Sequence, residues 1–187
     1  CHAIESFWSV NSTDESKEYS KQAIGLIMEN MEGYLANTED GNRNMLRAAN
    51  IAGKSINITQ TTAGHAMCYK LTSLYGIAHG HAAALCVSEL FPYMIAHIED
   101  CIDSRGTAYL KSVFSDIADA MGCENTADAA ELFRSIVVRL DLGVPDMKSE
   151  HDIDILKNSV NPVRLKNHPI SLSVNTIENL YRNILNR

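Results

Sequence analysis

Apolar side chains recur along this chain with the spacing of one face of an α-helix. In the clearest segment they fall at i, i+3, i+4, i+7, i+8 and i+11, as Leu110, Val113, Phe114, Ile117, Ala118 and Met121. Similar stripes run through positions 23–35, 132–140 and 177–185. This period is typical of amphipathic helices that bury one face. No segment alternates apolar and polar residues convincingly, as a half-buried strand would.

Residues with capping chemistry mark the ends of several stripes. Gly122 follows the stripe at 110–121, at a position where a left-handed residue commonly ends a helix. Asn175 and Glu178 have the spacing of a capping box, which predicts that the last helix starts near Asn175. These signals together predict an all-α fold, a bundle of about eight helices that forms one domain over residues 1–187.

Composition and charge exclude several classes of function. The net charge is −7 and no block of Lys and Arg occurs, so a nucleic-acid partner is not expected. No apolar run reaches the about 18 residues of a membrane span, and the expected location is cytoplasmic. The five cysteines are an odd number without a CxxC pair, which favours reduced thiols. Cys1 falls inside a predicted helix over residues 1–8, so we expect a preceding segment to be missing.

The candidate chemistry concentrates in residues 63–81, which hold three of the seven histidines. His65 and Tyr69 are four positions apart and therefore share a helix face. Gly76 allows the chain to turn, and His79 then opens a second apolar helix at 82–94. Two histidines on adjoining helices can converge on one point, and imidazole suits a divalent cation such as Fe²⁺ or Zn²⁺. By spacing alone this evidence is weak, because a buried histidine that is only hydrogen-bonded is the more common outcome.

Three motifs resemble the iron-containing (group III) alcohol dehydrogenases. The opening Cys-His-Ala-Ile-Glu-Ser at 1–6 is similar to the family's stretch in which Asp-x-x-x-His precedes Ala-(Ile/Leu)-Glu. His-Ala-Met at 65–67 is followed by Leu-Tyr-Gly-Ile-Ala-His-Gly at 74–80, and Asn-Pro-Val-Arg stands at 161–164. Order and separation agree over essentially the whole chain. The resemblance implies the C-terminal helical domain of a dehydroquinate synthase-like fold, without its N-terminal nucleotide-binding α/β domain.

This resemblance also implies a metal centre. The family holds its metal with one Asp and three His, and the matching histidines here are His2, His65 and His79. The matching Asp would stand four residues before His2 and thus outside this chain. The expected ion is Fe²⁺ or Zn²⁺, held more weakly without that carboxylate. NAD(P) would bind mainly to the missing domain, so the isolated chain is expected to be inactive, and the full-length protein to be a homo-oligomer.

Resemblance further implies roles around the metal. Many members carry a second histidine where this chain has Tyr69, and a phenol with a reference pKa near 10 is a poorer proton shuttle than imidazole at pH 7. His81 is the other candidate for proton relay. Lys70 and Arg164 could bind an anionic substrate, because the segment around Tyr69 is closer to the phosphonoacetaldehyde reductase branch than to simple alcohol dehydrogenases.

Two other interpretations remain open at this point. The related dehydroquinate synthase and glycerol dehydrogenase branches share the architecture and a metal between helices, although the His-Ala-Met and Asn-Pro-Val-Arg motifs favour the alcohol dehydrogenases. A metal-free helical interaction module is the alternative from another class. That module predicts that no ion co-purifies and that replacing His65 and His79 by Ala leaves folding unchanged.

Overall fold

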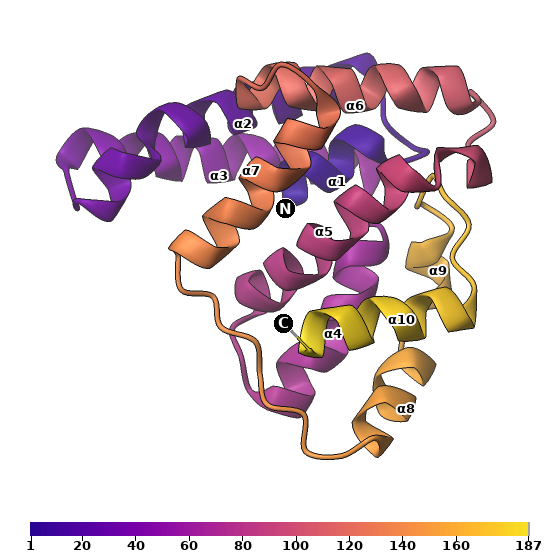
Figure 1. Cartoon of the computed structure of the whole chain (residues 1–187). Coiled ribbons are helices and arrows are strands. Elements are labelled where there is room, and N and C mark those ends of the chain that lie inside the picture. Colours follow the sequence, from indigo (N-terminus) through magenta and orange to yellow (C-terminus); the bar gives the residue numbers. More distant parts are fainter. Residues whose placement is uncertain (187) are drawn as a thin grey trace.

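The computed structural model describes residues 1–186, and the described part is helical as predicted (Figure 1). It contains ten α-helices and one short 3₁₀ helix, η1 (Ile98–Asp100). The α-helices are α1 (His2–Trp8), α2 (Asp14–Leu35), α3 (Glu39–Thr59), α4 (Ala63–Tyr75), α5 (His79–Ala96), α6 (Thr107–Met121), α7 (Thr126–Arg139), α8 (His151–Asn158), α9 (Pro162–Leu165) and α10 (Val174–Leu185). The single β-type pairing among residues 1–186 is an isolated bridge between Cys101 and Ile170.

The helices bury two apolar cores. In the first, α1 packs against α2, α3 and α6, around Phe7, Trp8, Phe91 and the predicted stripe of α6. In the second, α4 packs against α5 while α10 packs against α5 and α8, around Met67, Leu90 and Tyr181. The long helix α5 contributes side chains to both cores. The two cores therefore meet at α5 and both contain its side chains.

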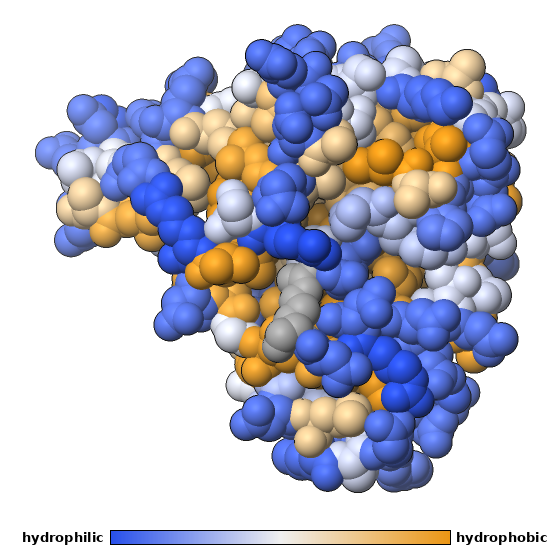
Figure 2. Space-filling view, viewed as in Figure 1, coloured by the Kyte–Doolittle hydropathy of each residue, from blue (hydrophilic) through white to orange (hydrophobic). Residues whose placement is uncertain are grey.

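The pair α2–α3 extends outward from the rest of the molecule at the left of Figure 1. Ala23 and Ile24 are buried where α2 meets the body, but Leu35 at the far end is 47% exposed. The predicted stripe at 23–35 is thus buried only in its first part, because the outer ends of α2 and α3 have mainly each other to pack against. Hydrophilic side chains cover most of that outer end in Figure 2.

Two details differ from the sequence-based expectation. Helix α10 starts one residue earlier than Asn175, since the Ser173 hydroxyl accepts the amide of Thr176 at 3.1 Å and serves as the N-cap. The helix count exceeds eight partly because α9 is one turn long, initiated by Asn161 and Pro162. A four-residue helix is too short to display a 3.6-residue period. Among residues 1–186, no helix combines the length and apolar character that crossing a membrane would need.

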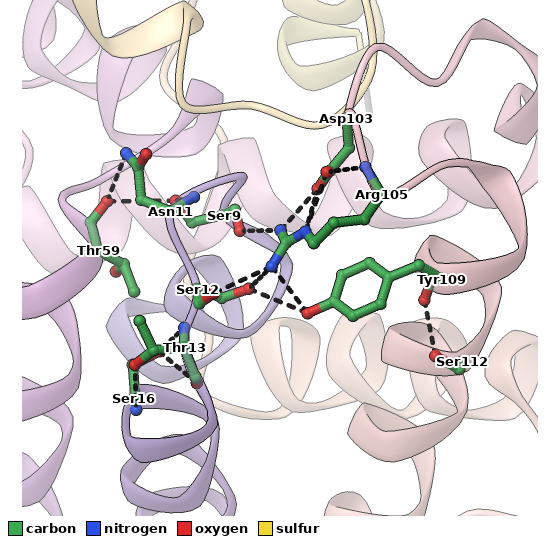
Figure 3. A network of polar contacts seen from close by, with 10 residues as sticks. All are labelled: Ser9, Asn11, Ser12, Thr13, Ser16, Thr59, Asp103, Arg105, Tyr109 and Ser112. Carbon is green, nitrogen blue, oxygen red and sulfur yellow. Dashed lines mark hydrogen bonds and ion pairs between the residues drawn. The ribbon is translucent and has the colours of Figure 1, made fainter.

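A buried ion pair fixes the end of α1. Asp103 is 6% exposed and accepts from Arg105 Nε at 2.9 Å and Nη2 at 2.6 Å. The same guanidinium donates to the backbone oxygens of Ser9 and Ser12, both at 2.9 Å, and lies over the Tyr109 ring (Figure 3). The turn after α1 is thereby tied to the start of α6.

Candidate metal centre

Three helix starts bring His2, His65 and His79 together. His2 opens α1, His65 lies in the first turn of α4, and His79 opens α5. Gly76 ends α4 in the left-handed conformation, with φ of 71°, which allows the chain to reverse into α5. The ring centroids of His2 and His65 are 4.6 Å apart, and those of His65 and His79 are 5.2 Å apart. The three predicted ligands therefore form one cluster.

A buried carboxylate stands directly behind the middle ring. Glu5 of α1 is 0% exposed, and its Oε2 accepts a hydrogen bond from Nδ1 of His65. Its Oε1 accepts from the Thr62 hydroxyl at 2.7 Å and from the backbone amide of His65 at 3.2 Å. Trp8 Nε1 in turn donates to the Thr62 hydroxyl at 3.0 Å. Glu5 thus holds both the backbone and the ring of His65.

Gly64 allows this close approach. A Cβ built at Gly64 would lie 2.7 Å from Glu5 Oε1 and 2.8 Å from Val87 Cγ2. Both separations are shorter than non-bonded atoms tolerate. A side chain at this position would separate α4 from α1 and α5. The small residue before His65 is therefore required by packing.

The surroundings of His2 and His79 favour their neutral imidazoles. Partial burial lowers the pKa of His2 to about 4, and the neighbouring His65 adds to the effect. Partial burial also lowers the pKa of His79, together with His65 and Arg164. Burial alone would raise the pKa of Glu5, but hydrogen bonds from His65 and Thr62 outweigh it and lower that pKa. Neutral rings offer the lone pairs that metal binding requires.

Tyr69 and Arg164 extend the cluster toward the surface. The Tyr69 ring is 45% exposed and lies 5.3 Å from the His79 ring, centroid to centroid. The guanidinium carbon of Arg164 lies 5.2 Å from the centre of the Tyr69 ring. Arg164 also donates to the Thr61 hydroxyl. Within residues 1–186 it forms no ion pair with a carboxylate, so its charge stands uncompensated beside the histidines.

Other predicted site residues are placed differently. The His81 ring donates through Nε2 to the carbonyl oxygen of Gly143 at 2.8 Å, which ties the start of α5 to the loop after α7. Lys70 is half-buried on α4, next to Tyr69 in sequence but about 100° around the helix from it. Within residues 1–186 neither side chain forms a hydrogen bond or ring contact with the three clustered rings, and their proposed roles stay predictions.

The cluster has the donor chemistry of a metal site but not a closed coordination shell. No three His, Cys, Asp or Glu side chains of residues 1–186 are arranged so that they could hold one ion as they stand. Nδ1 of His65 is engaged by Glu5, and Nδ1 of His79 lies 3.7 Å from the Cys68 sulfur. The Nε2 atoms of both rings remain available to coordinate a metal ion. Imidazole nitrogens of this kind suit Fe²⁺ or Zn²⁺.

Comparison with known proteins identifies the family. The sequence matches the Fe-containing alcohol dehydrogenase family, C-terminal, over residues 1–185. The chain belongs to this family. The resemblance seen in the three motifs is therefore confirmed.

Relatives within the iron-containing alcohol dehydrogenase family differ in substrate. A phosphonoacetaldehyde reductase of Streptomyces viridochromogenes is 34% identical over 125 residues, 65% of this chain and 32% of that protein. A 1,3-propanediol dehydrogenase of Klebsiella pneumoniae is 32% identical over 154 residues, 77% of this chain and 36% of that protein. The chain thus spans about a third of the curated relatives that it matches.

Solved structures of the family share the fold. Sulfoacetaldehyde reductase from Bifidobacterium kashiwanohense, in complex with NAD⁺, superposes with a TM-score of 0.83 at 23% identity, covering 98% of this chain and 47% of that chain. An iron-containing alcohol dehydrogenase from Thermococcus thioreducens gives 0.83 at 17% identity, covering 99% and 48%. At these identities the likeness establishes the helical architecture alone.

Glu5 is the site residue that sequence reasoning missed. It belongs to the opening motif, but one acidic residue in a short helix gives no sign of whether it is buried. Its importance depends on Thr62 and His65, which are 57 and 60 positions away. The available signal in the sequence was the small residues Ala63, Gly64 and Ala66 around His65, which indicate close helix packing at this point.

Proposed function

We propose that this chain is the metal-holding helical domain of an NAD(P)-dependent alcohol dehydrogenase or aldehyde reductase. The observation that carries the proposal is the convergence of His2, His65 and His79 at three helix starts, in a chain of the iron-containing alcohol dehydrogenase family. Nε2 of His65 and of His79, with a nitrogen of His2, would hold Fe²⁺ or Zn²⁺. A further carboxylate ligand from outside these residues would complete the shell.

The bound ion would supply Lewis-acid polarisation of the substrate oxygen. Partial burial lowers the pKa of His2 and of His79, and Glu5 fixes the direction of the His65 ring, so that the reacting oxygen would be presented at a defined point. Hydride would come from NAD(P)H bound mainly by residues outside this chain. The isolated helical domain is accordingly proposed to be inactive, and the full-length enzyme is the form to test.

The metal centre can be tested on the full-length protein by metal analysis with mass spectrometry. We expect close to one Fe²⁺ or Zn²⁺ per chain in the wild type and a large loss in His65→Ala and His79→Ala. His151→Ala, which changes an exposed histidine on α8, is the matched control and should keep its metal. Wild-type protein without a bound ion, after purification with added Fe²⁺ or Zn²⁺, would contradict the proposal and favour a metal-free helical module.

An anionic aldehyde is the proposed substrate class. Arg164 lies on the Tyr69 ring beside His79, and its charge has no carboxylate partner among residues 1–186. A guanidinium in this state can bind a phosphonate or sulfonate through charge-assisted hydrogen bonds. The phosphonoacetaldehyde reductase among the relatives agrees with this class. Tyr69 would orient the guanidinium and line the path to the metal.

Arg164→Gln tests this specificity in the full-length enzyme. We expect kcat/KM for phosphonoacetaldehyde to fall by about 10- to 100-fold, the value of a hydrogen bond to a charged group. The value for butyraldehyde should change by less than about 3-fold, because an uncharged aldehyde gains nothing from the cation. Lys166→Gln, an exposed cation two residues further on, is the matched control. A wild type without preference for the charged aldehyde would overturn the substrate assignment while leaving the metal centre standing.

A further inference from the structure

We propose, building on the metal centre proposed above, that Glu5 is a positioning residue that sets the tautomer and direction of the His65 ring. Glu5 contacts Nδ1 of the His65 ring and belongs to no group of three side chains within residues 1–186 that could hold one ion, so it would act through His65 and not as a ligand itself. It is fully buried, and every hydrogen bond that it forms in the described structure is with a donor group.

The tautomer follows from those contacts. An ionised carboxylate can only accept hydrogen bonds. Because Glu5 Oε2 contacts Nδ1 of His65, Nδ1 has to carry the hydrogen, so that in the neutral ring it is Nε2 that keeps its lone pair. A carboxylate behind a histidine also makes the free ring nitrogen a better donor to a metal. The ring is thereby prepared for coordination before any ion binds.

In the first turn of α4, Glu5 takes the place of the usual N-cap hydrogen bond. A threonine at the N-cap usually accepts the amide of N2 or N3 with its hydroxyl. Thr62 is the N-cap of α4, yet its hydroxyl makes no such bond and instead donates to Glu5. Glu5 accepts the N3 amide, which is that of His65. The carboxylate of α1 therefore caps α4 and orients its N3 side chain together, a pairing that an ordinary threonine cap would not provide.

Nearby groups hold Glu5 itself in place. Trp8 Nε1 donates to the Thr62 hydroxyl, so that hydroxyl has its own hydrogen directed at Glu5. Gly64 leaves the space that Oε1 occupies. The carboxylate is thus confined from two sides, and the direction of the His65 ring follows from it.

The test has two readouts on metal-free full-length protein. The first is the tautomer of His65, measured by NMR on protein with ¹⁵N-labelled histidine and assigned with His65→Ala. We expect the wild-type ring to carry its hydrogen on Nδ1. A ring that carries it on Nε2 would overturn the proposal without any change at Glu5. In Glu5→Gln the fixed tautomer should give way to a mixture, since an amide can both donate and accept.

Zn²⁺ affinity, measured by competition with a chelator, is the second readout. We expect Glu5→Gln to weaken Zn²⁺ binding by about 10- to 100-fold, the usual effect of removing a partner behind a ligand. Asp103→Asn is the matched control, because it makes the same change at another buried carboxylate that contacts Arg105 and none of the three rings. It should lower the stability of the protein and leave Zn²⁺ affinity within about 2-fold.

The outcomes separate the two proposals. Wild-type protein that binds Zn²⁺, with Glu5→Gln binding it equally well, would overturn the positioning role and leave the metal centre intact. Wild-type protein that binds no Zn²⁺ would contradict the proposed metal centre. The NMR spectrum would still decide whether Glu5 sets the tautomer of the His65 ring. Should Glu5→Gln fail to fold, the wild-type spectrum remains decisive.

Discussion

The close packing of α4 against α1 and α5 depends on Gly64. A methyl group there would lie 2.7 Å from Glu5 Oε1 and 2.8 Å from Val87 Cγ2. We expect Gly64→Ala to lower the free energy of unfolding by about 1–3 kcal/mol, the usual cost of inserting a methyl group into a packed core. Urea unfolding followed by circular dichroism measures the change.

Gly53→Ala is the control, because it makes the same glycine-to-alanine change at a position where the added methyl group has space. Gly53 lies inside α3, and a Cβ there would have nothing within 4 Å. Because alanine favours a helix over glycine, this variant should gain up to about 1 kcal/mol. Equal effects of the two substitutions would show that packing at Gly64 is looser than the structure indicates.

Residue by residue, the sequence predicted the cluster through short local motifs. His2, His65 and His79 each stand in a recognisable motif, and the structure brings their rings together. Glu5 was not predicted, because its contacts join residues about 60 positions apart and no local spacing reports burial. The ring of His81 contacts the carbonyl of Gly143, a contact that no local motif indicated, and its relay role stays a prediction.

The buried face of a helix was predicted well where neighbouring helices pack along its whole length. The stripe of α6 is buried throughout, because α1, α2 and α7 lie against it. In α7 the buried residues are Ala129, Ala130 and Val137, while Leu140 of the predicted stripe is 37% exposed. A periodic stripe shows which face is apolar. It does not show how far along the helix a partner extends, since that depends on contacts distant in sequence.

Between elements, the Asp103–Arg105 pair joins the turn after α1 to α6, and its loss gives a prediction. Arg105→Ala would leave the buried Asp103 carboxylate without its counter-charge and remove donors to Ser9 and Ser12. Breaking a buried pair in this way costs about 3 kcal/mol, at the low end of its usual range because Arg105 is partly exposed. Chemical unfolding of the variant measures the loss.

Two further variants test that explanation. Replacing Asp103 and Arg105 together by Ala should cost less than Arg105→Ala alone, because no unpaired charge is left buried. Arg43→Ala removes an ion pair of α3 whose two partners are both largely exposed, and it should change stability by less than about 1 kcal/mol. A double variant less stable than Arg105→Ala would contradict the role assigned to the leftover carboxylate.

Across the whole molecule, the candidate centre lies where the two apolar cores meet. His2 is carried by α1 of the first core, and His65 by α4 of the second. Cys1, next to His2, packs against both. The cluster is therefore assembled only when both cores have formed around α5. We expect the histidine rings to lose their arrangement upon global unfolding and not by local opening of one helix.

Stability of the whole molecule should fall in mild acid because of His168. Its ring is fully buried beside Trp8, and both ring nitrogens lack a hydrogen-bond partner within residues 1–186. Burial lowers the pKa of His168 from 6.5 to about 4. In the unfolded chain the His168 ring therefore becomes protonated below about pH 6.5, whereas in the folded protein it becomes protonated only near pH 4. Folding is favoured above this window and loses about 3 kcal/mol as the pH falls through it.

His168→Leu, which keeps a similar volume, should remove this part of the pH dependence. The free energy of unfolding, measured in urea at pH 7 and at pH 4.5, should fall by about 2 kcal/mol less in the variant than in the wild type. His2 and His79 also have lowered pKa values, but they are present in both proteins and cancel in the difference. The exposed His151→Leu should behave as the wild type. An identical loss of stability in wild type and His168→Leu would show that the buried ring accepts a proton without unfolding.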